Sequence, residues 1–509
     1  MPEFVRLYHT ITVRALQINA ALTTCTLCGM LNGVELDAMK EKSVSENRKI
    51  NTTLFFNILA PIILSGISFF TIPIFTRMLG PTNYGYYTVY NSYQSILLIV
   101  MSLQTHASIS TTSVYYKGKD RDRCFSNGIT ISLLFSLAVS VIVMCLSGPI
   151  SKLTDISVFM IFVMLLHTVG MFGVNWAMGR LAYDKKAKWN FLVSITVSVS
   201  ATVISLIWIP LAAQGPAKYQ AYVLGHAIPY ILVGVPSLLI FLVKGRSFFS
   251  KQEWKFVLTF CLPLIFHALS NTILHQSDKL MVDAMIGKEA AGIYGFAVTF
   301  ANILNIIYNA LNTTWIPFYH DDIAKGDKTV LFKKANNYLF LFSSLVIGFI
   351  MASPEVVKIF ASKDFWDSVN YIPLLSAGIY FIFLYSFPAN FEFYYKRSKI
   401  IAVGTTFACL FNIGLNYVLI GLIGMTGAAI ATLASYILLF IFHSIAAEFV
   451  IKEEYHYKGF KRVYIYMSIV LASCGLFYLI RDLVIVRWAI FASLAVALVV
   501  RTIKNKSIF

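Results

Sequence analysis

Long apolar segments separated by short polar loops follow one another from about residue 53 to the C-terminus. A membrane-spanning helix needs about 20 mainly apolar residues, and the chain holds fourteen runs of that kind. We predict spans at 53–76, 86–113, 125–148, 157–179, 190–213, 220–243, 256–283, 290–317, 333–352, 371–394, 400–422, 425–449, 462–480 and 484–501. The pattern therefore predicts an all-α integral membrane protein with about fourteen transmembrane helices.

Composition narrows the possible classes of protein. Of the 509 residues, 58% are hydrophobic and only 13% are charged, whereas a soluble globular chain carries about 25% charged residues. These proportions exclude a soluble enzyme and a disordered scaffold. They also exclude a nucleic-acid binder, although the net charge is +17, and we expect no nucleic-acid partner.

The basic residues support the number of spans and predict an orientation. Lys and Arg collect in the cytoplasmic loops of membrane proteins. When the N-terminus is placed in the cytoplasm, all but nine of the 41 basic residues fall in the inner loops and the tails. The nine are Arg77, Lys152, Lys218, Lys279, Lys288, Lys358, Lys363, Arg481 and Arg487. A missed or spurious span would have inverted this alternation, so we predict that both termini are cytoplasmic.

Residues 1–50 are predicted to form a cytoplasmic N-tail. Residues 1–38 show no clean helical period, and polar residues interrupt any signal-peptide core. Because Met39 begins a natural lead into the first span, we hypothesise that the protein starts there and that 1–38 is an upstream extension. Cys25 and Cys28 lack the second pair or the histidines of a metal site, so we expect neither a metal nor a cofactor.

A short motif occurs twice at the same place in the order of spans. Leu79-Gly80-Pro-Thr-Asn-Tyr-Gly85-Tyr-Tyr87 follows span 1, and Ile286-Gly287-Lys-Glu-Ala-Ala-Gly292-Ile-Tyr294 follows span 7, at an offset of 207 residues. One such glycine turn could recur by chance, but its position favours a duplication. Six spans per unit keep both units in the same orientation, related by a pseudo-two-fold axis along the membrane normal.

The duplication predicts the domain organisation. It gives an N-lobe (51–248, spans 1–6) and a C-lobe (249–451, spans 7–12). Residues 452–509 would add spans 13 and 14 and a cytoplasmic C-tail.

Polar side chains form a stripe along span 8. Its members, spaced +3, +4 and +3 so that they share one helix face, are Asn302, Asn305, Asn309 and Asn312. The corresponding positions of span 2, 207 residues earlier, are Ser95, Leu98, Ser102 and Thr105, and Asn91 and His106 extend this polar face. Small polar residues also hold membrane helices together, but we favour a water-filled cavity. Asn offers both a donor and an acceptor, which suits sugars.

Span 7 carries the densest ionisable set, with Asn271, His275, Asp278, Lys279 and Asp283. Intramembrane ionisable residues are costly and tend to face a cavity or the bundle interior. The Asp–Lys pair is as consistent with a neutralised structural pair as with a ligand-binding or proton-coupling site.

Arg77, at the end of span 1, and Glu392, near the inner end of span 10, complete the candidate site residues. Arg77 is a candidate anion contact. Alternatively, both side chains extend to the membrane interface.

The motifs resemble those of a known family. Ile72-Pro-Ile-Phe-Thr-Arg77-Met-Leu-Gly80 with Gly85-Tyr-Tyr87 looks like the start of Wzx-type polysaccharide (O-antigen) flippases. Asp278-Lys-Leu-Met-Val, Gly292-Ile-Tyr294 and Pro317 resemble their second half. The resemblance covers about 40–500 and implies the multidrug/oligosaccharidyl-lipid/polysaccharide exporter superfamily, with two six-helix lobes around a central cavity.

The resemblance also implies an activity. Wzx-type members move undecaprenyl-pyrophosphate-linked oligosaccharide repeat units to the outer leaflet by alternating access. In the related lipid-II flippases, an Arg at the position of Arg77 lies in a cationic cavity, although the surrounding basic set of those proteins is not evident here. The extra spans 13 and 14 resemble those of fourteen-helix members, where they would shelter a lipid tail.

Three functions are therefore weighed for the chain. The first is a flippase for lipid-linked oligosaccharide in the plasma (inner) membrane of a bacterium, with the bilayer, a polysaccharide polymerase and a chain-length regulator as expected partners. The second is a cation-coupled multidrug antiporter of the same superfamily, which would use Asp278 and Asp283. The third is an enzyme, a membrane polysaccharide polymerase or acyltransferase. Because nucleophile and phosphate-loop motifs are missing from the sequence, we expect no enzyme.

Overall fold

The computed structural model describes residues 33–325, 328–450 and 461–505. The chain divides into two compact units, 1–59 and 60–509, and each is described by itself. The predicted upstream extension and the pair Cys25 and Cys28 depend on residues 1–32, which lie outside the described residues. The hypothesis that the protein starts at Met39 therefore stays a prediction.

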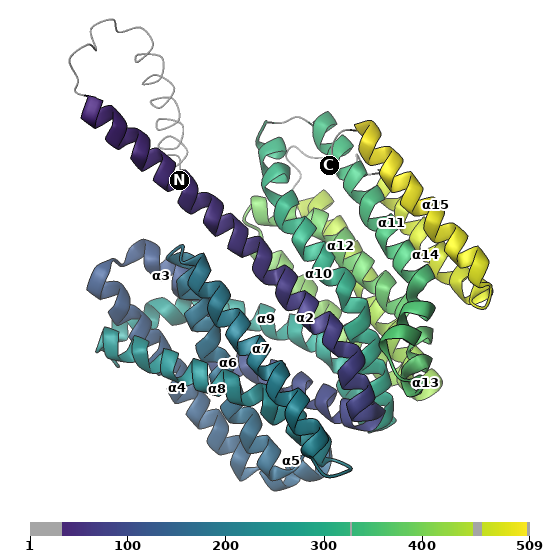
Figure 1. Ribbon diagram of the computed structural model, residues 1–509, viewed down its shortest axis with the longest axis horizontal. Coiled ribbons are helices and arrows are strands. Elements are labelled where there is room, and N and C mark those ends of the chain that lie inside the picture. Colours follow the sequence, from purple (N-terminus) through teal and green to yellow (C-terminus); the bar gives the residue numbers. More distant parts are fainter. Residues whose placement is uncertain (1–32, 326–327, 451–460, 506–509) are drawn as a thin grey trace, which may run out of the picture. The chain divides into compact units, whose positions relative to one another are not determined.

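Helices make up the described ranges, which contain no strand (Figure 1). In chain order they are α2 (Gly33–Ser102), η1 (Thr105–Ser108), α3 (Ile109–Tyr115), α4 (Gly118–Cys145), α5 (Ser147–Thr154), α6 (Val158–Tyr183), α7 (Ala187–Leu211), α8 (Ala217–Gly245), α9 (Lys251–Met285), α10 (Lys288–Lys325), α11 (Lys328–Phe360), η2 (Lys363–Asn370), α12 (Ile372–Tyr394), α13 (Ser398–Val450), α14 (Lys461–Ile480) and α15 (Val484–Asn505). The predicted all-α architecture is confirmed.

The predicted spans map onto these helices, with two pairs joined end to end. Eleven helices of the described ranges are long and apolar enough to cross a membrane. One of them, α13, contains the predicted spans 400–422 and 425–449 on either side of a kink at Ile423 and Gly424. Similarly, α2 contains span 1 and most of span 2 on either side of Gly80, whose φ of 69° is readily adopted only by glycine.

The prediction of one continuous helix over 86–113 is wrong. The helix ends at Ser102, where Leu103 and Gln104 adopt positive φ, and the chain continues as η1 and α3. Side-chain hydrogen bonds explain the break. The Ser132 hydroxyl of α4 lies 2.7 Å from that of Thr105 and 2.8 Å from the carbonyl of Ser102. These bonds compete with the helical hydrogen bonds and tie the chain to α4.

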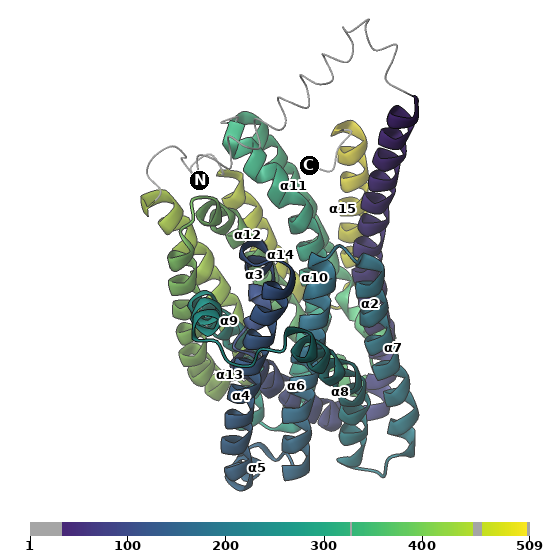
Figure 2. The ribbon, with the colours of Figure 1, turned by 90° about the vertical axis from the view of Figure 1, so that its left-hand side faces the viewer.

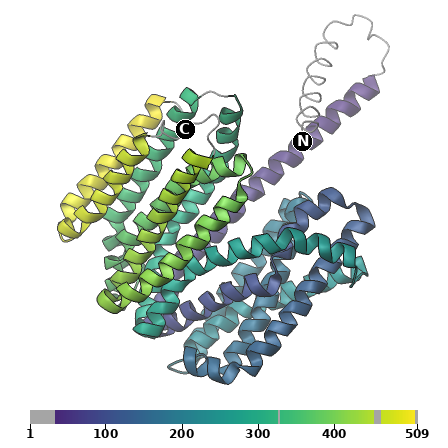
Figure 3. The same ribbon diagram turned by 180° about the vertical axis from the view of Figure 1, so that it is seen from behind.

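The helices of the N-lobe pack around α8. This helix contacts α4, α6 and α7, and α6 also contacts α4 and α7. Figures 1 and 3 show these four helices gathered in one group. A layer of aromatic side chains fills its interior, with Trp176 packed between Phe125 and Phe241.

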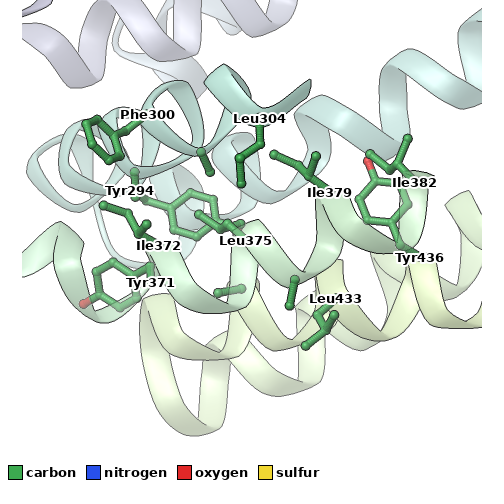
Figure 4. Close-up of a cluster of buried hydrophobic side chains, with 14 of the residues drawn as sticks. Tyr294, Phe300, Leu304, Tyr371, Ile372, Leu375, Ile379, Ile382, Leu433 and Tyr436 are labelled. Atoms are coloured by element: carbon green, nitrogen blue, oxygen red, sulfur yellow. The ribbon is translucent and has the colours of Figure 1, made fainter. Parts of the chain in front are cut away.

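The C-lobe is built around α12, which contacts α10, α11 and α13. α12 and α13 are neighbours in Figure 2. Figure 4 shows apolar side chains of α10, α12 and α13 meeting, among them Leu304, Leu375 and Leu433. Helices α14 and α15 pack on α11. There the buried Arg487 donates to both carboxylate oxygens of Glu355, at 2.6 and 2.8 Å.

Candidate substrate cavity

The repeated glycines meet where the two lobes cross. A Cβ on Gly85 would overlap the carbonyl oxygen of Lys288, and a Cβ on Gly292 would overlap that of Pro81. Pro81 and Lys288 are themselves separated by the repeat offset of 207, as are Gly85 and Gly292. The contact is therefore reciprocal, as expected where two related halves meet on a two-fold axis.

Polar contacts also join the lobes at this end, which the charge pattern predicts to be the outer one. The Lys288 ammonium donates to the carbonyl of Thr154 (2.8 Å) and pairs with Asp283 (2.5 Å). Arg77 is exposed and donates to the carbonyl of Ile359 at the end of α11 (3.1 Å). Two candidate site residues, Arg77 and Asp283, thus take part in contacts at the lobe junction.

A cavity of about 410 Å³ lies directly behind this junction, and its walls come from both lobes. α2, α7 and α8 of the N-lobe line one side, and α9 and α10 of the C-lobe supply Lys279, Gly295 and Thr299. A central cavity was predicted from the polar stripes, and the family resemblance implies two helical lobes around it. Of the candidate site residues, only Asn91 and Lys279 line it.

Lys279 is the single Lys, Arg, Asp or Glu side chain among the lining residues. It is 9% exposed. Within the described part of the chain, its ammonium has neither a hydrogen bond nor an ion pair within 4.0 Å. A largely buried charge without a partner is costly, so this ammonium is suited to a negatively charged ligand.

Asp278 points away from the cavity, although it is the neighbour of Lys279 in sequence. Its carboxylate is 2% exposed and accepts from the hydroxyls of Tyr294 (2.9 Å) and Thr432 (3.3 Å) and from the main-chain N–H of Lys279 (2.7 Å). One turn away, Nδ1 of His275 lies 2.7 Å from the hydroxyl of Tyr436. Both side chains are therefore part of the hydrogen-bonded interior of the C-lobe.

The asparagine stripe of α10 continues the cavity-lining face that carries Gly295 and Thr299. Its amides form a ladder, in which Asn305 donates to Asn302 (3.0 Å) and Asn309 donates to Asn305 (3.5 Å). Asn302 and Asn309 are exposed, and Asn312 is half-buried. The stripe thus presents amides beyond the cavity, on the side away from the lobe junction.

Other candidate residues lie elsewhere. In the N-lobe stripe, Ser102 and Thr105 are buried against α4, and His106 lies in η1, off the helix that carries Asn91. Asn271 is half-buried on α9. Glu392 is fully buried between α12 and α13, where it pairs with His443.

The aromatic and hydroxyl-bearing wall of the cavity was not predicted from the sequence. Tyr222, His226 and Tyr230 line it from α8, and Ser198 and Thr202 line it from α7. Both sets are spaced by four residues and so share one helix face. That spacing was a signal in the sequence, but aromatic residues at this interval are as common in apolar cores.

Metal ligands are not gathered anywhere in residues 33–325, 328–450 and 461–505. No group of three or more His, Cys, Asp or Glu side chains in those ranges could hold a metal ion. The described cysteines, Cys124, Cys145, Cys261, Cys409 and Cys474, form no disulfide with one another.

Comparison with known proteins gives a family and a fold. Residues 52–321, more than half of the chain, match the family described as polysaccharide biosynthesis protein. A protein of the Lsg locus of Haemophilus influenzae is 23% identical over 354 residues, which cover 66% of this chain and 82% of the relative. An uncharacterized membrane protein of Methanocaldococcus jannaschii is 24% identical over 269 residues, which cover 48% of this chain and 50% of the relative.

Two solved structures are similar in fold. The lipid II flippase MurJ, in an inward closed conformation, has a TM-score of 0.65 at 17% identity, with 87% of this chain and 99% of that chain covered. An inward-facing multidrug resistance transporter of the MATE family, from the MOP superfamily, has a TM-score of 0.62 at 13% identity, with 79% of this chain and 99% of that chain covered.

Proposed function

Because the chain belongs to the polysaccharide biosynthesis protein family, we propose that it is a flippase for undecaprenyl-pyrophosphate-linked oligosaccharide repeat units. It is a multi-pass membrane protein with the fold of known transporters. In this proposal it works in the plasma (inner) membrane of a bacterium, with both termini cytoplasmic. It carries the units to the outer leaflet for capsule, O-antigen or exopolysaccharide synthesis.

The ammonium of Lys279, which has no hydrogen bond or ion pair among the described residues, is the observation that carries this proposal. A pyrophosphate brings at least two negative charges, and a hydrogen bond to a charged group contributes about 1.5–3 kcal/mol. Lys279 supplies such a contact from the wall of the cavity.

The rest of the wall supports a sugar next to the pyrophosphate. Asn91 and Thr299 offer hydrogen-bonding groups, and Tyr87 and Tyr230 offer aromatic rings with polar tips. A volume of about 410 Å³ lies at the lower end of the usual range for ligand pockets, about 300–1,000 Å³. It suits the pyrophosphate and the first sugars, so the polyprenyl chain would stay in the bilayer.

A cation-coupled drug antiporter is the second candidate, and the cavity argues against it. Such a protein needs a carboxylate to attract a cationic drug. None lines the cavity among the described residues. The carboxylate of Asp278 accepts hydrogen bonds inside the C-lobe, and that of Asp283 is paired with Lys288. An enzyme is a weaker candidate still, because the family and the fold point to transport.

Transport by alternating access requires the lobes to part at the junction that closes one end of the cavity. The reciprocal glycine crossing and the Lys288 bridge hold this end together in the present conformation. Opening of this junction would expose the cavity at the end that is predicted to be the outer one.

The proposal is tested in vesicles that contain the purified full chain and undecaprenyl-pyrophosphate-linked N-acetylglucosamine. Movement between leaflets is followed by the access of an impermeant sugar-binding protein. Lys279→Ala should reduce the affinity for this lipid about ten- to a hundredfold, because it removes a charge-assisted contact. Lys279→Arg should retain most of it.

Lys218→Ala is the matched control, because Lys218 is outside the set of residues that line the cavity. It should move the lipid like the parent protein. If the parent protein leaves the lipid in its original leaflet, the proposed function is wrong. If Lys279→Ala transports normally, Lys279 is not the pyrophosphate contact.

A further inference from the structure

A buried acid–histidine pair lies in the C-lobe, outside the substrate cavity. Nδ1 of His443 on α13 is 2.8 Å from Oε2 and 3.0 Å from Oε1 of Glu392 on α12. Both side chains are 0% exposed. Neither residue lines the cavity, so substrate binding does not account for the pair.

Burying such a pair inside a membrane protein costs free energy. Ionisable side chains inside a membrane protein are costly and usually mark ion or proton pathways. A buried ion pair often contributes less to stability than apolar residues of similar volume would. Structural need alone is therefore a weak explanation of an acid and a histidine inside the C-lobe.

The second ring nitrogen of His443 has no hydrogen-bond partner among the described residues. This nitrogen, Nε2, is buried. It faces the backbone of Gly404, where a Cβ would lie 2.9 Å from it. One nitrogen of this imidazole is hydrogen-bonded to a carboxylate, and the other has no hydrogen-bond partner among the described residues. The second nitrogen can therefore accept one proton.

The titratable groups beside the pair come from α12 and α9. On α12, the ring of Tyr385 lies 5.5 Å from that of His443. On α9, His267 lies within electrostatic range of His443, is half-buried, and has a buried Nδ1 that lacks a partner among the described residues. The neighbouring segment of α13 contributes Gly404, which carries no charge.

We propose that His443 and Glu392 form a proton-binding site that loads and unloads one proton in each transport cycle. In the unloaded state, neutral His443 donates Nδ1–H to the Glu392 carboxylate, Nε2 carries a lone pair, and the pair has a charge of −1. One proton from the aqueous phase binds Nε2 and gives an imidazolium–carboxylate pair without net charge. Release reverses this step, and no covalent bond between heavy atoms changes.

The first test needs no substrate and therefore does not depend on the proposed function. The ring nitrogens of histidine are labelled with ¹⁵N in the full chain in vesicles, and the His443 signals are assigned by their loss in His443→Gln. We expect these signals to change from neutral imidazole to imidazolium as the buffer is made acidic. In Glu392→Gln, the imidazolium signal should be absent over the same pH range. Signals of His443 that stay in one form throughout would overturn the proposal.

The second test measures coupling and rests on the proposed function. A pH difference of one unit is worth about 1.4 kcal/mol per proton, so one coupled proton should shift the distribution of the lipid-linked sugar between the leaflets about tenfold. Glu392→Gln and His443→Gln should let the lipid equilibrate and abolish the shift.

Asp322→Asn is the matched control, because it removes a buried C-lobe carboxylate that pairs with Lys334 (2.7 Å). In this variant the distribution of the lipid should still respond to the pH difference.

Where a single variant does not fold, the double variant Glu392→Gln/His443→Gln replaces both members by amides of similar size. Equilibration of the parent protein without any response to pH would overturn proton coupling and leave the flippase standing. A parent protein that does not move the lipid would overturn the flippase, and the nitrogen signals would still decide the proton site.

Discussion

At the scale of single residues, neighbours in sequence have opposite surroundings. Asp278 and Lys279 are adjacent on α9, yet one side chain lies in the C-lobe interior and the other lines the cavity. Among the described residues no ion pair within 4.0 Å joins the Asp278 carboxylate to the Lys279 ammonium. The carboxylate is stabilised by hydroxyls instead, which leaves the ammonium available to a ligand.

The hydroxyl of Tyr294 is therefore predicted to matter for stability. Tyr294→Phe removes one of three donors to a carboxylate that is 2% exposed. Losing a partner of a buried charged group costs about 1–3 kcal/mol. Thermal unfolding of the purified protein, followed by tryptophan fluorescence, should show a lower Tm.

Tyr417→Phe serves as the control for this variant, because Tyr417 is 70% exposed. Its Tm should match that of the parent protein. Equal Tm values for the two variants would mean that the Tyr294 hydroxyl does not stabilise Asp278.

At the scale of elements, the packing of α2 against α10 depends on the absence of side chains. The Cβ positions of Gly85 and Gly292 are occupied by backbone of the other helix. Backbone cannot move aside as the end of a flexible side chain can, so the two helices would have to separate. Each of the two glycines makes room for the backbone of the helix from the other half of the repeat.

Gly292→Ala is predicted to destabilise this crossing. Overpacking of a close contact costs about 1–3 kcal/mol, which exceeds the gain of about 1 kcal/mol from the better helix propensity of alanine. The Tm of the purified variant should therefore fall. Gly475→Ala is the comparison, because nothing lies within 4 Å of a Cβ at that position of α14. It should leave the Tm unchanged or raise it, and a similar fall in both variants would contradict the role of the crossing.

At the scale of the whole membrane unit, Lys288 connects the lobes at the end predicted to be outer. It joins the carbonyl of Thr154, in the N-lobe, to Asp283, in the C-lobe. Beside it, the hydroxyl of Tyr86 donates to the carboxylate of Asp155. The bridge made by Lys288 favours the conformation in which the cavity is closed at that end, whereas the Tyr86–Asp155 hydrogen bond lies within the N-lobe.

Lys288→Met is predicted to open the cavity more often towards that end. Loss of charge-assisted contacts worth about 1.4 kcal/mol would raise the open population about tenfold. The measurement uses Thr299→Cys in the cavity wall, in a background without the native cysteines. An impermeant thiol reagent added outside should label this cysteine about ten times faster in the Lys288→Met variant.

Lys363→Met is the control, because Lys363 lies in η2, is exposed, and has no part in the bridge. It should label like the parent protein. Unchanged labelling after Lys288→Met would mean that the bridge does not hold the lobes together.

The pattern of apolar runs predicted most of the helices, because the hydrophobic length of a membrane span is a local property of the sequence. The same reasoning failed at 86–113. There the main-chain carbonyl of Ser102 and the hydroxyl of Thr105 hydrogen-bond with the hydroxyl of Ser132, which lies 30 and 27 positions further along the chain. A local pattern contains no information about a partner at that distance.

The candidate site also has features that the sequence determines and features that only the tertiary structure decides. The sequence alone determined the membrane class, the order of the spans and the repeat whose glycines meet, since all of these depend on local composition or on self-similarity. Only the tertiary structure decided that Lys279 reaches the cavity while Asp278 does not, that Tyr222, His226 and Tyr230 form its wall, and that Glu392 meets His443 across 51 residues. Those facts depend on how each helix is rotated about its axis, and that rotation is set by packing against helices that are distant in sequence.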